Sequence, residues 1–287
     1  RLLGDFRGAR TLDEQTLRHR QAVLADGHPE TLSSRAGLAY DLFGLGDYAG
    51  AADLLASVRV DDEHPFALWV ARVAAMVARR RGAANAVELA EVTVALSRRR
   101  FGDLHVETLA AVVSLAHAAR AAGDLDQAHE LLERAVIRYH SVLGDEHPFT
   151  LAAGAGLAGV VRAGGRPAEA RQIDLEALGG LRRSVGPDHP FTLGCANGYA
   201  IDLFGVGDRQ EAQQLAGDTW QRSRMVRGAE HPDTLACAWN AVLGGGDEEA
   251  RSQVTAALVK AYGEGHPVLA RTARSERLET DLDLPPL

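Results

Sequence analysis

The sequence predicts an all-α solenoid of about fourteen helices arranged in antiparallel pairs, and three observations support this prediction. A phrase of the form His-Pro-x-Thr-Leu, or a close variant, recurs at intervals of 36, 41, 42, 42, 42 and 35 residues. A glycine follows most copies by 18 residues, and another glycine lies three residues before most copies. The copies begin at His28, His64, His105, His147, His189 and His231, with a degenerate seventh at His266.

The His-Pro pair is expected to open the first helix of each unit, helix A. Proline at the first helical position is preorganised and lacks an N–H group that would otherwise be unpaired. Acidic residues just before it, such as Asp145 and Glu146, favour the positive end of the helix dipole. We therefore expect the repeat histidines at or next to equivalent helix N-termini.

The two glycines are expected to end the two helices, because glycine readily takes the left-handed conformation of a helix C-cap. Gly123 and Gly165 would end helix A, whereas Gly144 and Gly186 would end a helix B of about 18 residues. Apolar residues follow helical spacing in both helices. Alanine recurs at one position of helix B where the paired helices must lie close, namely at Ala51, Ala128, Ala170 and Ala212.

These landmarks predict one solenoid over residues 1–278, followed by an acidic tail with leucine and proline over 279–287. The solenoid would hold a partial repeat (1–27), repeats starting near 28, 64, 105, 147, 189 and 231, and a capping helix (266–278). Helix B of the first copy and the whole sixth copy are short, so irregular geometry is expected there. Because the chain starts without methionine, we interpret it as a piece of a longer protein.

Composition excludes several classes of protein. The net charge of −8 argues against a non-specific nucleic-acid binder. No run of about 18 apolar residues is present, so we expect no membrane span and a cytoplasmic location. The two cysteines imply no disulfide framework. Cys195 and Cys237 occupy the same place in successive A helices, whose axes pack about 8–10 Å apart, so we expect buried, free thiols.

No motif in the chain predicts catalysis. Residues 154–159 match G-x-G-x-x-G but lie inside a predicted helix, where a dinucleotide site would need a preceding strand. Three glycines there would soften the helix or allow close approach of another chain. One histidine per repeat cannot converge on a metal ion. We found no Walker loop, no G-x-S-x-G and no paired carboxylates in an apolar frame. We therefore expect no catalytic residues, no cofactor, no metal and no enzyme activity.

Paired helices with alanine at the helix contact and glycine in the turn resemble tetratricopeptide repeats (TPR). The 42-residue period with G-x-x-HP-x-TL resembles the kinesin light chain subtype. The longer text, R-x-x-VLG-x-x-HP-x-TL with GD-x-x-x-A, is similar to arrays in actinobacterial proteins that follow nucleotide-binding STAND-type (NB-ARC-like) domains or stand in peptide-modification clusters. The resemblance covers about residues 5–278 and implies a right-handed superhelix. The family's paired asparagines in helix A are mostly missing here.

In the TPR family helix A lines a concave wall, so the resemblance implies where a partner would bind. When the copies are aligned on the turn glycine, we expect exposed positions 5, 8, 12, 15 and 16 residues after the histidine. At these positions several repeats have arginine, and the first and last repeats have aromatic residues, so the groove is expected to hold arginines with aromatics toward both ends. Arginine at the end of helix A could instead complement the helix dipole, which does not explain Arg72. The candidate binding residues are Tyr40, Phe43, Trp69, Arg72, Met76, Arg79, Arg80, His117, Arg120, Arg162, Asn197, Phe204 and Trp239.

The expected function is a protein- or peptide-binding scaffold or sensor that grips an extended or acidic segment, within a larger signalling or peptide-modification protein. An accessory piece of an enzyme with an upstream catalytic domain is the alternative, and nucleic-acid binding through the arginines is disfavoured by the charge. The tail is first interpreted as a frayed end or a cap. If it occupies a groove instead, we expect self-association, because ten extended residues reach only about 35 Å and the arginines lie three to five repeats away.

Overall fold

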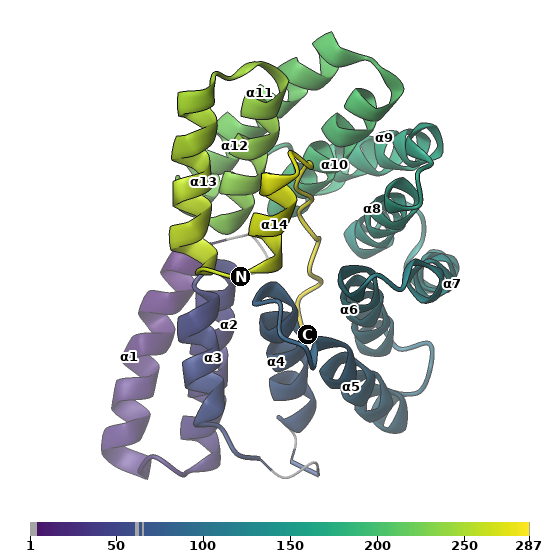
Figure 1. The fold of residues 1–287 in the computed structure, drawn as a ribbon. Coiled ribbons are helices and arrows are strands. Elements are labelled where there is room, and N and C mark those ends of the chain that lie inside the picture. The colour runs from purple at the N-terminus through teal and green to yellow at the C-terminus, as the bar shows by residue number, and fades with distance from the viewer. Residues whose placement is uncertain (1–4, 61–62, 65, 287) are drawn as a thin grey trace. The chain divides into compact units, whose positions relative to one another are not determined.

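The computed structural model describes residues 5–60, 63–64 and 66–286, and these form fourteen helices (Figure 1). No strand occurs among the described residues, so the predicted all-α class and the helix number are confirmed. Pro65, Leu287 and residues 1–4 of the predicted partial repeat lie outside the described residues. The helices are α1 (Phe6–Leu24), α2 (Pro29–Gly44), α3 (Tyr48–Ala56), α4 (Ala67–Arg80), α5 (Ala86–Phe101), α6 (Val106–Ala122), α7 (Leu125–Leu143), α8 (Pro148–Ala163), α9 (Pro167–Ser184), α10 (Pro190–Val206), α11 (Arg209–Arg227), α12 (Pro232–Gly245), α13 (Glu248–Tyr262) and α14 (Pro267–Ala273).

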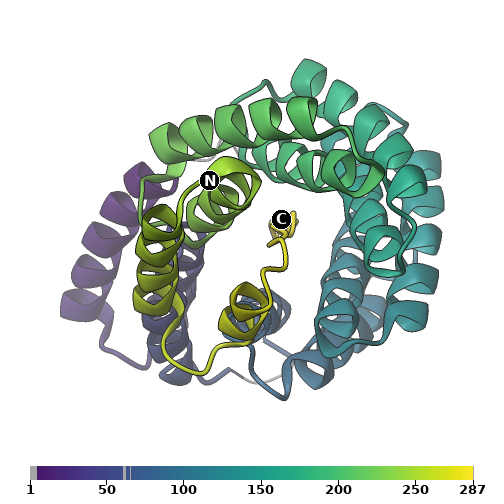
Figure 2. The same ribbon diagram turned by 45° about the horizontal axis from the view of Figure 1, so that its top comes forward.

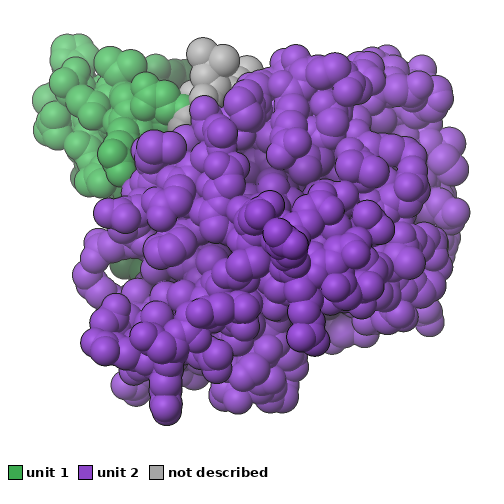
Figure 3. Space-filling view, turned by 90° about the horizontal axis from the view of Figure 1, so that it is seen from above, with its two compact units in different colours: residues 1–118, 285–287 green, residues 119–284 purple. Residues whose placement is uncertain are grey.

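The chain divides into two compact units, which Figure 3 distinguishes by colour. Unit 1 comprises residues 1–118 and 285–287, and unit 2 comprises residues 119–284. In unit 1, α2 packs against α1, α3 and α4, and α4 packs against α3 and α5. In unit 2, every helix from α7 to α14 packs against the next, and α10 also contacts α8 and α12. The helices α8, α10 and α12 therefore form a row, as the A helices of a stacked repeat do.

Most repeat histidines lie at the N-termini of the A helices, as predicted, but His64 lies three residues before α4, whose N-cap is Phe66. His147 and His189 are N-cap residues, and the Nδ1 atom of each accepts a hydrogen bond from the main-chain N–H two residues later at 3.1 Å. This bond satisfies one of the N–H groups that a helix start leaves unpaired. The same bond, at 3.1–3.2 Å, is made by His28, His64, His105, His231 and His266.

The glycines end the helices as expected in most copies. Gly123 and Gly144 have φ angles of 92° and 85°, in a region that L side chains rarely adopt. The shortened sixth copy differs, because Gly246 follows α12 with a φ of −77° and extended backbone. Helix α3 of the first copy is likewise short, with nine residues.

The alanine position in helix B is where the paired helices touch. All four alanines predicted there are fully buried, with 0% exposure. A larger side chain would have no room between the helix axes, so the alanine fixes the close packing of each pair. The four residues are Ala51, Ala128, Ala170 and Ala212.

The last helix is shorter than the capping helix predicted over 266–278. Helix α14 ends at Ala273, and Ser275 takes a positive φ of 56°. The N–H of Glu276 then bonds back to the carbonyl of Arg271 at 3.0 Å, which is the pairing of a Schellman-type helix end. Residues 274–286, called the tail below, follow without helix.

None of the described helices combines the length and apolar character needed to cross a bilayer.

Candidate functional site

The tail lies along the row formed by α8, α10 and α12 in unit 2 (Figures 1 and 2). Its side chains alternate, as those of an extended chain do. From residue 278 to residue 284 the even positions are buried, whereas Glu279, Asp281 and Asp283 are partly exposed. The buried residues are Leu278, Thr280, Leu282 and Leu284. The tail is therefore seated on the helices of unit 2 and is neither frayed nor confined to a cap over the last pair.

Two asparagines hold the main chain of the tail at Leu278. The Asn240 side chain accepts the N–H of Leu278 at 2.8 Å and donates to its carbonyl at 2.7 Å. Asn197 donates to the same carbonyl at 2.9 Å, and its own oxygen accepts a bond from Asn240. Both asparagines are buried. This arrangement satisfies both main-chain groups of one residue, as a neighbouring β-strand would.

The side chain of Leu278 enters an apolar cluster at the end of unit 2. Leu235, Trp239 and Leu258 are among the buried members of this cluster. The Trp239 Nε1 atom also donates to the carbonyl of Glu276 at 2.8 Å. The entry of the tail is thus fixed by both apolar burial and main-chain bonds.

Arg277 lies over the ring of Phe204, with its guanidinium carbon 3.2 Å from the ring centroid. It also donates to the main-chain carbonyl of Asn240 at 2.9 Å. Burial lowers the pKa of Arg277 to about 10, because desolvation disfavours the charged form. Phe204 therefore contacts the tail through a cation–π interaction.

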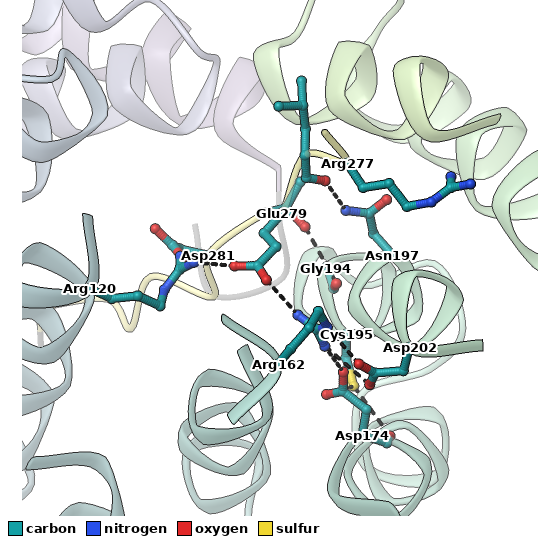
Figure 4. Close-up of polar contacts among 12 residues, drawn as sticks. Arg120, Arg162, Asp174, Gly194, Cys195, Asn197, Asp202, Arg277, Glu279 and Asp281 are labelled. Atoms are coloured by element: carbon teal, nitrogen blue, oxygen red, sulfur yellow. Dashed lines mark hydrogen bonds and ion pairs between the residues drawn. The ribbon is translucent and has the colours of Figure 1, made fainter. Parts of the chain in front are cut away.

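Two arginines bind the acidic side chains of the tail (Figure 4). Arg120 forms ion pairs with both Glu279 and Asp281. The Nη1 atom of Arg162 bonds the second carboxylate oxygen of Glu279 at 2.8 Å. Glu279 thus lies between Arg120 on α6 and Arg162 on α8. Burial alone would raise the pKa of Glu279, but the two arginines outweigh it and lower the pKa.

Arg162 also forms ion pairs with two buried carboxylates, one on α9 and one on α10. Its Nη2 atom lies 2.5 Å from Asp174, and its Nε atom lies 2.6 Å from Asp202. Burial raises the pKa of both aspartates. The positive charge of Arg162 lowers these pKa values, whereas the carboxylate of Glu279 raises them. Burial opposes the charge of Arg162, but the three carboxylates around it raise its pKa.

A glycine makes room for the middle of the tail. Thr280 donates to the carbonyl of Gly194 at 3.4 Å. A Cβ atom at Gly194 would lie 2.9 Å from the side chain of Leu282, closer than real Cβ contacts. The absence of a side chain at Gly194 therefore lets the tail lie directly against α10.

The expectation that the tail cannot reach the arginines in its own chain is wrong. The expectation compared the length of the extended tail with the number of repeats between the tail and the arginines along the sequence. In unit 2 the tail crosses the inner side of the row instead, so that consecutive tail residues reach different repeats. Leu278 is bound by Asn197 and Asn240 on α10 and α12, and Glu279 already reaches Arg162 on α8.

The predicted groove residues of unit 2 all belong to this site. Arg120, Arg162, Asn197, Phe204 and Trp239 contact the tail through the bonds given above. Arg120 and Arg162 retain about a tenth of their side-chain exposure. Asn197 and Trp239 were expected to be exposed, but the tail and the neighbouring helices bury them.

The remaining predicted positions lie in unit 1, where most are buried. Tyr40 stacks on Phe43 and meets Trp69 edge-on. Arg72 is 2% exposed, pairs with Glu107 at 2.5 Å and donates to the carbonyl of Pro285 at 3.3 Å. The expected exposure is wrong for these residues because helix packing covers their positions. The buried ones are Tyr40, Phe43, Arg72, Met76, Arg79 and His117, whereas Trp69 and Arg80 stay partly exposed and Arg80 lies over Tyr48. A single groove shared by Arg72, Arg79, Arg120 and Arg162 stays a prediction.

Sequence reasoning missed several residues of the site, among them Gly194, Arg277, Asn240, Asp174 and Asp202. Asn240 was overlooked because its copy is three residues short, so that counting from His231 selected Trp239. Counting back from the turn glycine Gly246 would have found it. Asp174 and Asp202 form a pair of buried carboxylates that the sequence was expected to lack. They come from different helices, and no local spacing reveals such a pair.

Both cysteines are free and buried, as predicted. Burial raises the pKa of the Cys237 thiol to about 12 and that of Cys195, beside Asp174, well above its usual value. Among the described residues, no group of three or more His, Cys, Asp or Glu side chains is arranged to hold a metal ion.

Comparison with known families identifies the repeat. Two tetratricopeptide repeat profiles match, one over residues 107–181 and one over 192–233. These two segments of the chain therefore carry tetratricopeptide repeats. TPR arrays are generally interaction scaffolds without catalytic activity of their own. No curated protein matches the chain significantly.

Several solved structures share the fold. The nearly identical TPR-like repeats of a kinesin light chain-like protein from Podosopora anserina are 29% identical, cover 70% of this chain and 98% of their own, and give a TM-score of 0.52. The apo quorum sensor NprR from B. thuringiensis is 12% identical with a TM-score of 0.62 and coverage of 93% and 82%. A STAND protein with a TPR sensor from Pyrococcus horikoshii is 11% identical, with a TM-score of 0.53, over 94% of this chain and 42% of that one.

Proposed function

We propose that this protein binds an extended, acidic segment of a protein or peptide partner on the tail-binding face of unit 2. This face is defined by Arg120, Arg162, Gly194, Asn197 and Asn240. The observation that supports the proposal is the way the chain's own tail is held there. Main-chain clamps, an apolar pocket and paired arginines are what recognition of an extended peptide requires.

The asparagines and the arginines of this face bind different parts of a peptide. Asn197 and Asn240 bond to main-chain atoms, which every peptide offers. Arg120 and Arg162 bond to carboxylates, which only an acidic segment offers. Affinity from the main chain and selectivity from charge suit a partner that arrives unfolded and becomes ordered on binding.

The wider role that we propose is that of a sensor or scaffold in a cytoplasmic signalling or peptide-modification protein. The Pyrococcus horikoshii neighbour is a STAND protein with a TPR sensor, and NprR is a quorum sensor. Their likeness supports a sensing role for an array of this fold. We assign the chain no catalytic step, and the net charge of −8 disfavours nucleic acid as the partner.

A direct binding measurement tests the proposal. The probe is a fluorescein-labelled peptide with the sequence of residues 276–286. The receptor is the full chain with Leu278→Ser, Glu279→Lys and Asp281→Lys, called the released-tail variant, whose own tail should leave the face. We expect saturable anisotropy, and adding Asn240→Ala should weaken binding at least about tenfold by removing two hydrogen bonds.

The proposal fails if a released-tail variant with normal helicity and melting shows no saturable binding of the probe. It also fails if Asn240→Ala leaves the affinity unchanged, because the probe would then bind elsewhere. Gln15→Ala, at an exposed position of α1 in unit 1, serves as the matched control and should have no effect.

A further inference from the structure

The seated tail shows what each position of the face accepts. Successive tail residues meet different surroundings, and some of these contacts depend on side-chain identity whereas others do not. The positions from Leu278 to Leu282 therefore describe a recognition pattern, and they also describe a competitor for it.

We propose that the tail-binding face selects extended segments with the pattern apolar–acidic–small–acidic–apolar, and that the tail is the chain's own competitor, which a partner segment must displace. The inference rests on the proposed function, because it specifies the partner of the same face.

The outer positions of the pattern are apolar. The side chain at the first position, held by Leu278, is 1% exposed and packs into the cluster around Trp239 and Leu258. The side chain at the fifth position, held by Leu282, is 5% exposed and lies against Gly194. A charged side chain at either position would be desolvated without a partner.

The second and fourth positions are acidic because Arg120 reaches both of them. It pairs with Glu279 and with Asp281, and Arg162 adds a second cation at Glu279 only. The second position is therefore the more demanding of the two. A basic residue there would face two largely buried guanidinium groups.

The third position requires a small residue. Thr280 is 7% exposed, and its hydroxyl donates to the carbonyl of Gly194. A Cβ atom at Gly194 would already lie 3.3 Å from this hydroxyl. Serine, threonine or alanine fit against α10, whereas an aromatic side chain does not.

The short tether makes the tail an effective competitor. Only residues 274–277 separate the end of α14 from Leu278. A short flexible linker gives an effective concentration on the order of 1 mM. A partner at micromolar concentration therefore meets a face that is occupied for most of the time, and the strength of the tail sets the threshold for binding.

The test compares the wild-type chain with the released-tail variant, using the same probe peptide. We expect the wild-type chain to bind the probe at least about tenfold more weakly. A control with Glu133→Lys and Glu264→Lys reverses two exposed carboxylates away from the tail and should behave as wild type. Hydrogen exchange should show the amide of residue 278 protected in the wild-type chain and unprotected in the released-tail variant.

Probe variants test the pattern on the released-tail variant. Replacing both acidic residues by lysine, or the threonine by tryptophan, should each weaken binding at least about tenfold.

Each contrary result has a distinct meaning. Equal affinity of the wild-type chain and the released-tail variant overturns the competition, and equal binding of all probe variants overturns the pattern, while the proposed function stands if Asn240→Ala still weakens binding. A wild-type dimer that dissociates in the released-tail variant, seen by sedimentation, assigns the tail to a second copy and overturns competition within one chain. Absence of probe binding by the released-tail variant defeats the proposed function itself.

Discussion

Asn240 pairs with both main-chain groups of Leu278, accepting its N–H at 2.8 Å and donating to its carbonyl at 2.7 Å. A single side chain on α12 thereby takes the place of a neighbouring strand. Because the bonds go to main-chain atoms, they hold the tail in register without reading its sequence. The register in turn decides which tail side chains meet the arginines.

The first prediction concerns this clamp. Asn240→Ala leaves the buried N–H of Leu278 without its acceptor, which should weaken docking of the tail by about 1–3 kcal/mol. Hydrogen exchange at Leu278 should accelerate by the corresponding factor, while amides in α8 and α10 keep their protection. Loss of protection throughout unit 2 would instead show that Asn240 supports the helices themselves.

The second prediction separates the two arginines. Arg162→Ala leaves Asp174 and Asp202 buried without a cation, which should cost about 3–5 kcal/mol of folding stability. The ion-pair partners of Arg120 both lie on the tail. Arg120→Ala should therefore loosen the tail and change the stability of the helices much less. Chemical denaturation followed by circular dichroism measures both effects.

Rescue provides the control for Arg162. In the triple variant Arg162→Ala, Asp174→Asn and Asp202→Asn, the buried negative charges are gone, so most of the lost stability should return. Equal destabilisation by Arg120→Ala and Arg162→Ala would contradict the different roles that the contacts assign to them.

The third prediction is a pH dependence of tail docking. The pKa of Asp174 is raised by burial, and Glu279 raises it further when the tail is seated. Docking therefore favours the protonated aspartate, and it should weaken as pH rises through this raised pKa. The pKa of Glu279 is lowered in the docked tail, so docking should also weaken as pH falls below the usual glutamate range.

Probe affinity for the released-tail variant should thus pass through a maximum, falling on the acidic side as Glu279 of the probe is protonated and on the alkaline side as Asp174 ionises. Asp174→Asn mimics the protonated acid and should remove the loss on the alkaline side while keeping the acidic side. An unchanged alkaline limb in Asp174→Asn would exclude this residue as its cause.

The fourth prediction compares two glycines in A helices. Gly194→Ala would place a Cβ atom 2.9 Å from the side chain of Leu282, so that side chain must shift and probe affinity should fall although alanine favours the helix. Gly154→Ala meets no atom within 4 Å and should stabilise α8 by about 0.5–1 kcal/mol. Melting curves and probe affinity distinguish the two, and a loss of tail protection in Gly154→Ala would contradict the prediction.

The helices could be predicted because their ends are marked locally. His147 caps a helix through its own imidazole, and Gly123 ends one through its own φ angle, so neither depends on distant residues. The location of the tail depends on how the row α8, α10 and α12 curves, which no local signal gives. The pairing of Asp174 with Arg162 likewise requires two helices to be placed before it can be seen. The arginines and aromatics were found from their equivalent positions in successive repeats. Whether such a position faces solvent, a neighbouring helix or the tail is decided by packing.

The imidazole caps give the whole array a common chemical requirement. Each repeat begins with a histidine whose Nδ1 atom accepts a main-chain N–H, and a protonated Nδ1 has no lone pair for this bond. Burial already lowers the pKa of His147, in keeping with a preference for the neutral ring. Acidification therefore acts at the start of α8, where protonation of His147 removes the acceptor of the Phe149 N–H and should loosen the first turn of that helix.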